Sequence, residues 1–163
     1  MFERILVAFD GSESSRGACR VALEIAARFG SSVTVAVVHP PSDEPTDGRL
    51  ELLVPVNPEG KTLAQMIEEM QKEAKSRKIP SLEPAFLQGD VVPTLLEYLR
   101  AHPQDLAVTG SRGLSRGRRL LLGSVSSALV DSAPCPVLVV RPDSSKSSGT
   151  GTRPAAPRPR SAR

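Results

Sequence analysis

Hydrophobic and polar positions along the chain follow two different periods, and each change of period marks the end of a predicted element. Short, nearly continuous apolar runs are typical of strands buried in a parallel sheet. Five such runs predict strands at residues 4–9, 33–38, 82–87, 106–109 and 137–140. Between them, apolar residues spaced three and four positions apart predict four amphipathic helices, at residues 12–29, 61–78, 91–101 and about 124–132.

Each of the first three helices has an apolar stripe that predicts its buried face. In the first helix the stripe ends at Phe29, and Gly30 is the stop signal that follows. Pro93 fits the first turn of the third helix, where a missing N–H has no helical partner to lose. The predicted buried residues are Ala18, Val21, Ala22, Ile25 and Phe29 in the first helix, Leu63, Ile67, Met70 and Ala74 in the second, and Val92, Leu95, Leu96 and Leu99 in the third.

Five strands that alternate with four helices predict a single α/β domain. The expected architecture is a doubly wound sandwich, with a five-stranded parallel sheet and helices on both faces. The strand at 82–87 is shorter and more polar, which favours a place near a sheet edge. Pro134 and Pro136 precede the last strand and are tolerated at an edge. Ligands of such sheets bind beyond the carboxyl ends of the strands, where the winding direction reverses.

Two segments fall outside this alternation. Residues 39–60 contain five prolines among polar residues, which predicts a long surface loop that covers part of the ligand site. Residues 143–163 are rich in Ser, Gly, Thr, Pro and Arg without apolar periodicity, which predicts a disordered basic tail. This tail contributes +4 to a net charge of +3, so residues 1–142, the predicted domain, sum to −1.

Charge and composition argue against several classes of protein. A nucleic-acid-binding domain carries its positive charge on the fold itself, so nucleic acid is not expected as a partner, although a weak contact of the tail with acidic partners stays open. No apolar run is long enough to span a bilayer, and the N-terminus lacks a secretory signal. Cys19 and Cys135 have neither metal-ligand spacing nor the density of a disulfide scaffold. We therefore expect a cytoplasmic protein.

The stretch from Asp105 to Val125 carries the candidate chemistry. After the apolar run at 106–109, glycine and serine follow in the spacing Gly110-x2-Gly113-x9-Gly123-Ser124. Glycine lets a backbone N–H approach a phosphate oxygen, and a helix that begins near Ser124 adds unpaired amides and a partial positive charge. The alternative is a glycine-rich connection with a solvated basic face. The cations of this stretch are Arg112, Arg116, Arg118 and Arg119.

Three separated segments resemble, in the same order, the universal stress protein family. Residues 105–141 resemble its C-terminal half, and their glycine spacing resembles the pattern of the ATP-binding branch. The start, Arg4-Ile-Leu-Val-Ala-Phe-Asp10-Gly-Ser12, resembles the family's opening strand and aspartate, and the end, Ala133-Pro-Cys-Pro-Val-Leu-Val-Val-Arg141, resembles its closing strand. The resemblance covers about residues 2–142 and is weakest at 40–60. It implies a Rossmann-like sheet in the order 3-2-1-4-5 and homodimers joined through the last strand, Val137, Leu138, Val139 and Val140.

If the first and fourth strands are adjacent, as the resemblance implies, Asp10 and Gly110 flank one crevice. Asp10 would then face the sugar, the phosphates or a bound Mg²⁺, which prefers one or two carboxylates plus phosphate oxygens. The resemblance implies contacts with adenine at Ala8 and Val38. Two simpler roles stay open, namely a turn that caps the first helix for Asp10 and a cap of the last helix for Ser124. The residues expected to hold the phosphates and ribose, mainly through backbone amides, are Gly110, Arg112, Gly113, Gly123, Ser124 and Val125.

Motifs of common nucleotide-dependent and hydrolytic enzymes are missing from the sequence. There is no Gly-x4-Gly-Lys-Ser/Thr loop, no Gly-x-Gly-x-x-Gly after the first strand and no Gly-x-Ser-x-Gly elbow. Neither His39 nor His102 sits in a metal-ligand pattern, and no residue is a candidate to position the attacking water of an ATPase. We therefore expect an ATP-binding stress-response or signalling module in which ATP, with Mg²⁺, is a ligand. The alternatives are a slow ATPase or phosphotransferase, and a dimeric interaction protein with a vestigial site.

Overall fold

The computed structural model describes residues 2–39, 55–56, 58–112 and 122–141. The elements agree with those that the hydrophobic pattern predicts. In chain order they are β1 (Arg4–Ala8), α1 (Glu13–Phe29), β2 (Ser32–His39), α2 (Leu63–Ser76), β3 (Leu82–Gln88), α3 (Val91–Ala101), β4 (Leu106–Gly110), α4 (Ser124–Ser132) and β5 (Val137–Val140). The predicted tail and most of the predicted loop at 39–60 lie outside the described residues.

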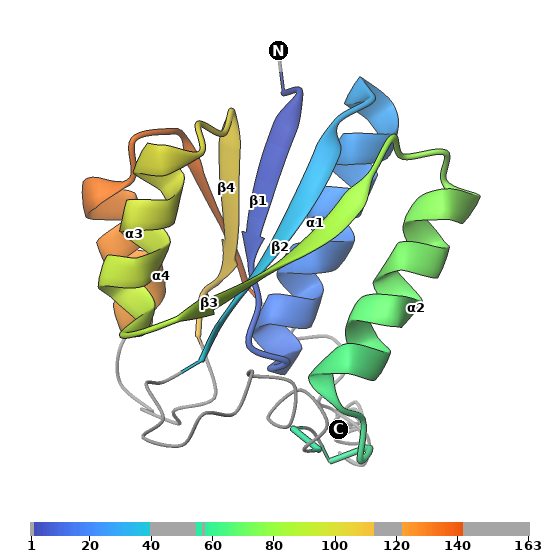
Figure 1. The fold of residues 1–163 in the computed structure, drawn as a ribbon, viewed down its shortest axis with the longest axis horizontal. Helices are drawn as coiled ribbons and strands as arrows, with labels where there is room; N and C mark the ends of the chain where they lie inside the picture. The colour runs from blue at the N-terminus through green and yellow to red at the C-terminus, as the bar shows by residue number, and fades with distance from the viewer. Residues whose placement is uncertain (1, 40–54, 57, 113–121, 142–163) are drawn as a thin grey trace, which may run out of the picture.

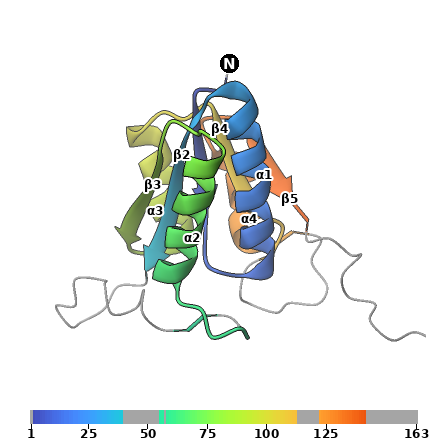
Figure 2. The same cartoon turned by 90° about the vertical axis from the view of Figure 1, so that its right-hand side faces the viewer.

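The five strands form one parallel sheet in the order β3-β2-β1-β4-β5. The first strand therefore lies at the centre, in register with β2 from Arg4 opposite Ser32 to Ala8 opposite Ala36. Helices α1 and α2 cover one face of the sheet and α3 and α4 cover the other (Figures 1 and 2). The expected strand order and doubly wound architecture are confirmed, and β3 and β5 form the two edges.

The sheet separates two hydrophobic cores, because successive side chains of a strand point to opposite faces. On β1, Ile5 and Val7 enter the core beneath α1 and α2, whereas Leu6 and Ala8 enter the core beneath α3 and α4. All four residues predicted for the stripe of α2 are buried. In α3, Leu95, Leu96 and Leu99 are buried and Val92 packs partly buried against them.

The buried face predicted for α1 is wrong in part. Phe29 is 58% exposed and lies edge-on to Phe2, with ring centroids 5.6 Å apart. The helix instead buries a face of mostly small residues: Ser14, Ser15, Gly17, Ala18, Cys19, Ala22, Leu23 and Ala26. Small side chains let the helix axis approach the sheet closely, so larger residues such as Phe29 are moved to the margin. Hydrophobicity alone does not reveal this, because serine and glycine carry no apolar signal.

Local hydrogen bonds fix where the helices begin and end. The Ser12 hydroxyl caps α1 by accepting the N–H of Ser15 at 3.2 Å, and Gly30 ends the helix in the left-handed conformation with φ of 69°. Helix α2 begins with a reciprocal capping box between Thr62 and Gln65. In the described part of the chain, no helix is both long and apolar enough to cross a membrane.

At the amino ends of the strands, one carboxylate ties β4 to β1. Asp105 accepts hydrogen bonds from the backbone N–H groups of Glu3 at 2.8 Å and Arg4 at 2.9 Å. These bonds and the Arg4 guanidinium lower the pKa of Asp105 below its ordinary value. The buried Ser31 hydroxyl donates to the carbonyl of Phe2 at the same end of the sheet.

Candidate functional site

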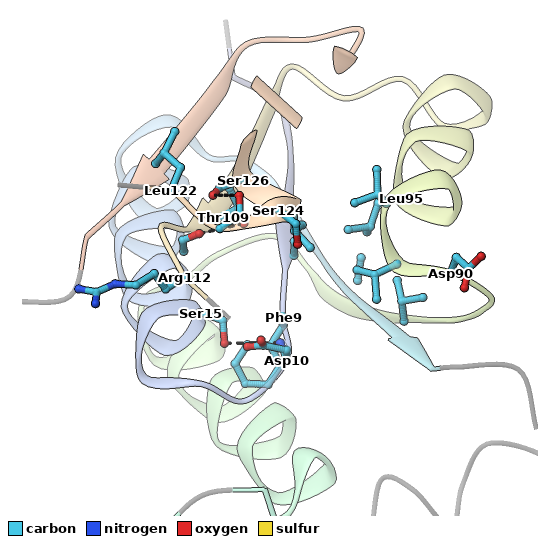
Figure 3. Close-up of a pocket in the computed structure, with 18 of the residues that line it drawn as sticks. Phe9, Asp10, Ser15, Asp90, Leu95, Thr109, Arg112, Leu122, Ser124 and Ser126 are labelled. Carbon is cyan, nitrogen blue, oxygen red and sulfur yellow. Dashed lines mark hydrogen bonds between the residues drawn. The ribbon is translucent and has the colours of Figure 1, made fainter. Parts of the chain in front are cut away.

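A cavity of about 810 Å³ opens at the carboxyl ends of the central strands. Its walls come from the ends of β1, β2 and β4 and from the first turns of α1, α3 and α4 (Figure 3). This is the edge of a doubly wound sheet at which ligands bind, because the winding direction reverses between β1 and β4. The volume falls within the range of about 300–1,000 Å³ that is usual for small-molecule sites.

The structure brings together the residues that the sequence singled out at both ends of the chain. Gly113 is the exception, because it lies outside the described residues. The convergence expected of Asp10 and Gly110 is present, since both line the one cavity. The predicted site residues that line it are Ala8, Asp10, Val38, Gly110, Arg112, Gly123, Ser124 and Val125.

One wall of the cavity is apolar and built from small side chains. Ala8 and Ala36 stand next to each other on β1 and β2, and Val38 follows two positions later on the same face. Leu95 of α3 faces them from the helical layer. An apolar, flat ligand group fits such a wall, because methyl side chains leave room above the sheet.

Asp10 lies directly beyond β1 in a tight turn. Its Oδ1 accepts the N–H of Ser12 at 3.0 Å, and the hydroxyl of Ser12 caps α1. The helix cap considered for Asp10 therefore belongs to Ser12. The Asp10 carboxylate is half-buried and lines the cavity, so it can face a polar ligand group.

Gly110 ends β4 where α1 passes closest to the sheet. A Cβ atom at this position would lie 2.6 Å from the carbonyl carbon of Ser14 and 2.5 Å from its hydroxyl oxygen. The packing of α1 therefore requires the absence of a side chain at this position. The glycine spacing alone predicts a different reason, the approach of a phosphate.

Two amides expected to bind phosphate donate within the protein instead. The N–H of Arg112 donates to the Ser14 hydroxyl at 3.3 Å, and the N–H of Gly123 donates to the carbonyl of Ser111 at 2.8 Å. The Arg112 side chain is exposed and extends outward from the end of β4 (Figure 3). The amides that can turn toward an anion are therefore those that follow Gly123.

Helix α4 presents such amides to the cavity. Gly123 occupies the cap position with φ of −75° and ψ of 169°, and no side chain of the described residues caps this helix. The first N–H groups of a helix have no partner within it, and they carry a partial positive charge. Ser124, Val125 and Ser126 belong to this first turn, and all three line the cavity. Because Ser124 is the first residue of the helix, the cap considered for it is excluded.

The other candidate groups of the sequence lie apart from the cavity lining. His39 is buried next to Phe86, and His102 stacks on Tyr98 with ring centroids 4.2 Å apart beyond the far end of α3. Neither cysteine lines the cavity, and burial raises the pKa of both thiols, so they stay protonated near neutral pH. The described ranges contain no cluster of three or more His, Cys, Asp or Glu side chains that could hold a metal ion by itself.

Several lining residues were missed by sequence reasoning. Ala36 had a signal, because it precedes Val38 by two positions and therefore shares its face. The residues of α3 had none, since the sequence does not state which helix overhangs the ends of which strands. The lining residues outside the prediction are Phe9, Ser15, Ala36, Asp90, Val91, Val92, Pro93, Leu95, Thr109, Leu122 and Ser126.

Comparison with known proteins identifies the family and its fold. The model of the universal stress protein family matches residues 1–141. The chain belongs to the universal stress protein family. It is 34% identical over 143 residues to a universal stress protein of Thermus aquaticus, covering 86% of this chain and 100% of that protein.

Solved structures of the family have the same architecture. The universal stress protein UspA from Lactobacillus plantarum is similar at 29% identity with a TM-score of 0.68, and the match covers 86% of this chain and 98% of that chain. A universal stress protein solved in complex with cAMP is similar at 25% identity with a TM-score of 0.69, and the match covers 87% of this chain and 99% of that chain.

Proposed function

We propose that this universal stress protein binds an adenine nucleotide in the cavity and acts as a nucleotide-dependent stress-response or signalling module. The observation that carries the proposal is the meeting, in one cavity, of the Ala8–Ala36 wall and the uncapped first turn of α4. A nucleotide has the matching pair of groups, a flat base and an anionic phosphate. The complex of a similar universal stress protein with cAMP supports this ligand class.

The two ends of the cavity suggest how the ligand lies. The base would rest on Ala8, Ala36 and Val38, and the phosphates would reach the amides of Ser124 and Val125. ATP is the nucleotide that the glycine spacing favours. Asp10 fits a companion Mg²⁺, because the ion takes one or two carboxylates and completes its shell with phosphate oxygens and water.

We propose that the nucleotide is a ligand rather than a substrate. The lining residues that the structure describes include no histidine and no lysine, and Arg112 is their one cation. Phosphoryl transfer needs cations on the transferred group and a residue that orients the attacking nucleophile. These lining residues therefore support binding of the nucleotide rather than transfer of its phosphoryl group.

We also propose that the protein forms homodimers through β5. The other edge strand, β3, contains Pro84 and the exposed Glu83, which are typical protections against pairing with another chain. Strand β5 is Val137-Leu-Val-Val140, four half-buried apolar residues without a charge or a proline. Its free edge is suited to a second copy of itself.

Two measurements test the nucleotide proposal. Native mass spectrometry of the purified protein should detect a bound adenine nucleotide, and calorimetric titration should show binding of ATP, AMP or cAMP by the nucleotide-free protein. Addition of Mg²⁺ should strengthen the binding of ATP and leave that of cAMP nearly unchanged. Absence of binding for all three nucleotides would remove the proposal.

A further inference from the structure

The hydroxyl of Ser14 links two parts of the cavity rim that are far apart in the sequence. Ser14 is the second residue of α1 and is only 5% exposed. Its Oγ accepts the backbone N–H of Arg112, 98 positions later, at 3.3 Å. Because Arg112 lies two residues beyond Gly110, the last residue of β4, this bond fixes the main chain at the point where it leaves that strand.

Close packing against Gly110 fixes the position of Ser14. The nearest approach of a hypothetical Cβ at Gly110 to the Ser14 hydroxyl is 2.5 Å, so the first turn of α1 sits directly against the end of β4. The same turn is tied to the Asp10 side of the cavity. The Ser15 hydroxyl donates to the carbonyl of Ser12 at 3.1 Å and accepts the N–H of Asp10 at 3.5 Å.

A second set of hydrogen bonds joins the main chain at Ser111 to the beginning of α4. The carbonyl of Ser111 accepts the N–H of Gly123 at 2.8 Å, and it also lies 3.4 Å from the hydroxyl of Ser126. The Ser126 hydroxyl donates at 3.0 Å to the carbonyl of Gly123, the cap residue of α4. The first turn of α4 is therefore held by the residue adjacent to Arg112.

From these contacts we infer that Ser14 is a positioning residue for phosphate recognition. Its hydroxyl holds the main chain at Arg112 in place. The adjacent Ser111 is hydrogen-bonded to Gly123 and Ser126, and these bonds fix where the amides of Ser124 and Val125 lie. Ser14 does not line the cavity, so it acts on the ligand only through these groups. The inference rests on the proposed function, and it adds a residue and a mechanism for distinguishing phosphate-bearing ligands from the bare nucleoside.

The test compares AMP with adenosine in the Ser14→Ala variant. This substitution keeps the Cβ atom and removes only the hydrogen-bond acceptor. Affinity for AMP should fall about five- to tenfold, the size of one net hydrogen bond, while affinity for adenosine should change less than about twofold. Hydrogen exchange of the Arg112 amide should become faster in the variant even without ligand.

Ser31→Ala is the matched control. Ser31 is also a buried serine with one hydrogen bond to a backbone group, but its partner Phe2 lies at the opposite end of the sheet. This variant should lose thermal stability like Ser14→Ala, yet the ratio of its affinities for AMP and adenosine should stay that of the wild type. A general loss of stability therefore would not produce the change in the ratio of AMP to adenosine affinity that we expect of Ser14→Ala.

The outcomes separate the inference from the proposed function. If wild-type protein binds AMP and the Ser14→Ala variant keeps the same ratio of AMP to adenosine affinity, the positioning role is wrong and nucleotide binding stands. If the wild type binds no nucleotide, both are wrong. Should the variant fail to fold, exchange of the Arg112 amide in the wild type decides, because an unprotected amide would mean that the Ser14 bond is absent.

Discussion

Ala8 and Ala36 are register neighbours at the carboxyl ends of β1 and β2, and both line the cavity. Each contributes a single methyl group to the wall that we assign to the base. The width of this part of the cavity is therefore set by two side chains of the sheet itself. A larger residue at either position would occupy the space of the ligand, since α3 closes the cavity from the opposite side.

Replacing Ala36 with leucine should weaken binding of the nucleoside part of the ligand. We expect affinity for adenosine and for AMP to fall together by at least about tenfold, because both need the base wall. The control is Ala85→Leu, at the half-buried register neighbour on β3, which does not line the cavity. Calorimetric titration of both variants checks this, and equal affinities in wild type and Ala36→Leu would place the base elsewhere.

Gly110, which packs against α1, and Gly17, which lies within α1, should respond to alanine in opposite directions. Gly110→Ala should lower the free energy of unfolding by about 1–3 kcal/mol, because the new methyl group overlaps the main chain of Ser14. Gly17→Ala should raise it by about 0.5–1 kcal/mol, because alanine favours the helix. At Gly17 the nearest atom to the new Cβ is a Val140 methyl at 3.8 Å, an ordinary contact.

Urea denaturation of the two glycine variants measures these changes. A stable Gly110→Ala protein would mean that α1 lies farther from β4 than the contact with Ser14 requires. A strongly destabilised Gly17→Ala protein would mean that α1 lies closer to β5 than the contact with Val140 indicates.

The stability of the protein should depend on the ionisation of Asp105. Its pKa is lowered in the folded state, first by the hydrogen bond from the Arg4 amide, so the carboxylate stabilises the fold above its ordinary pKa of 3.8. That contribution is lost as the pH falls through the lower folded value. Asp105→Asn should therefore be less stable than the wild type near neutral pH, and the difference should shrink below about pH 4.

Unfolding curves of both proteins between about pH 6 and pH 3 test this. As a control, Asp131→Asn changes an exposed aspartate of α4 and should leave the pH profile of the wild type intact. A constant difference between Asp105→Asn and wild type across the whole range would show that the carboxylate charge is not what ties β4 to β1.

A charge on the free edge of β5 should separate the proposed homodimer. Val139 packs in neither core, so Val139→Lys places a cation at the edge with little effect on the fold. Sedimentation equilibrium should give twice the chain mass for the wild type and the chain mass for this variant. Glu83→Lys, on the opposite edge strand, should remain dimeric. A wild type that is monomeric at high concentration would remove the proposal.

The hydrophobic pattern predicts the elements well because the helices repeat their buried residues at helical spacing, whereas the central strands are nearly continuous apolar runs buried on both faces. The strand order is different, since nothing in the periodicity states that β1 lies between β2 and β4. The resemblance to a family supplied that order, and the structure confirms it. Phe29 shows the limit of the pattern for helix faces, because the buried face of α1 consists mostly of small residues that allow close approach to the sheet, and hydrophobicity does not mark them.

The candidate site could be located from the sequence but not built from it. Gly110, Gly123 and Ser124 of the glycine spacing line the cavity, yet the packing reason for Gly110 is the position of Ser14, far away in the chain. Hydrogen bonds of Arg112 and Gly123 also depend on residues that only the fold brings near. For the same reason Leu95 of α3 and Asp90, the residue before that helix, were missed, since this part of the sequence contains no recognised motif.

The central position of β1 has a consequence for biosynthesis. Strand β1 has β2 as its one sheet neighbour until residues 106–110 have been translated, because β4 is its other neighbour. The cavity joins the turn after β1 to the beginning of α4, the last helix of the described chain. A product that stops before Leu122 lacks the cavity wall formed by residues 122–126, so the amides that we assign to the phosphates are present only once the start of α4 has been translated.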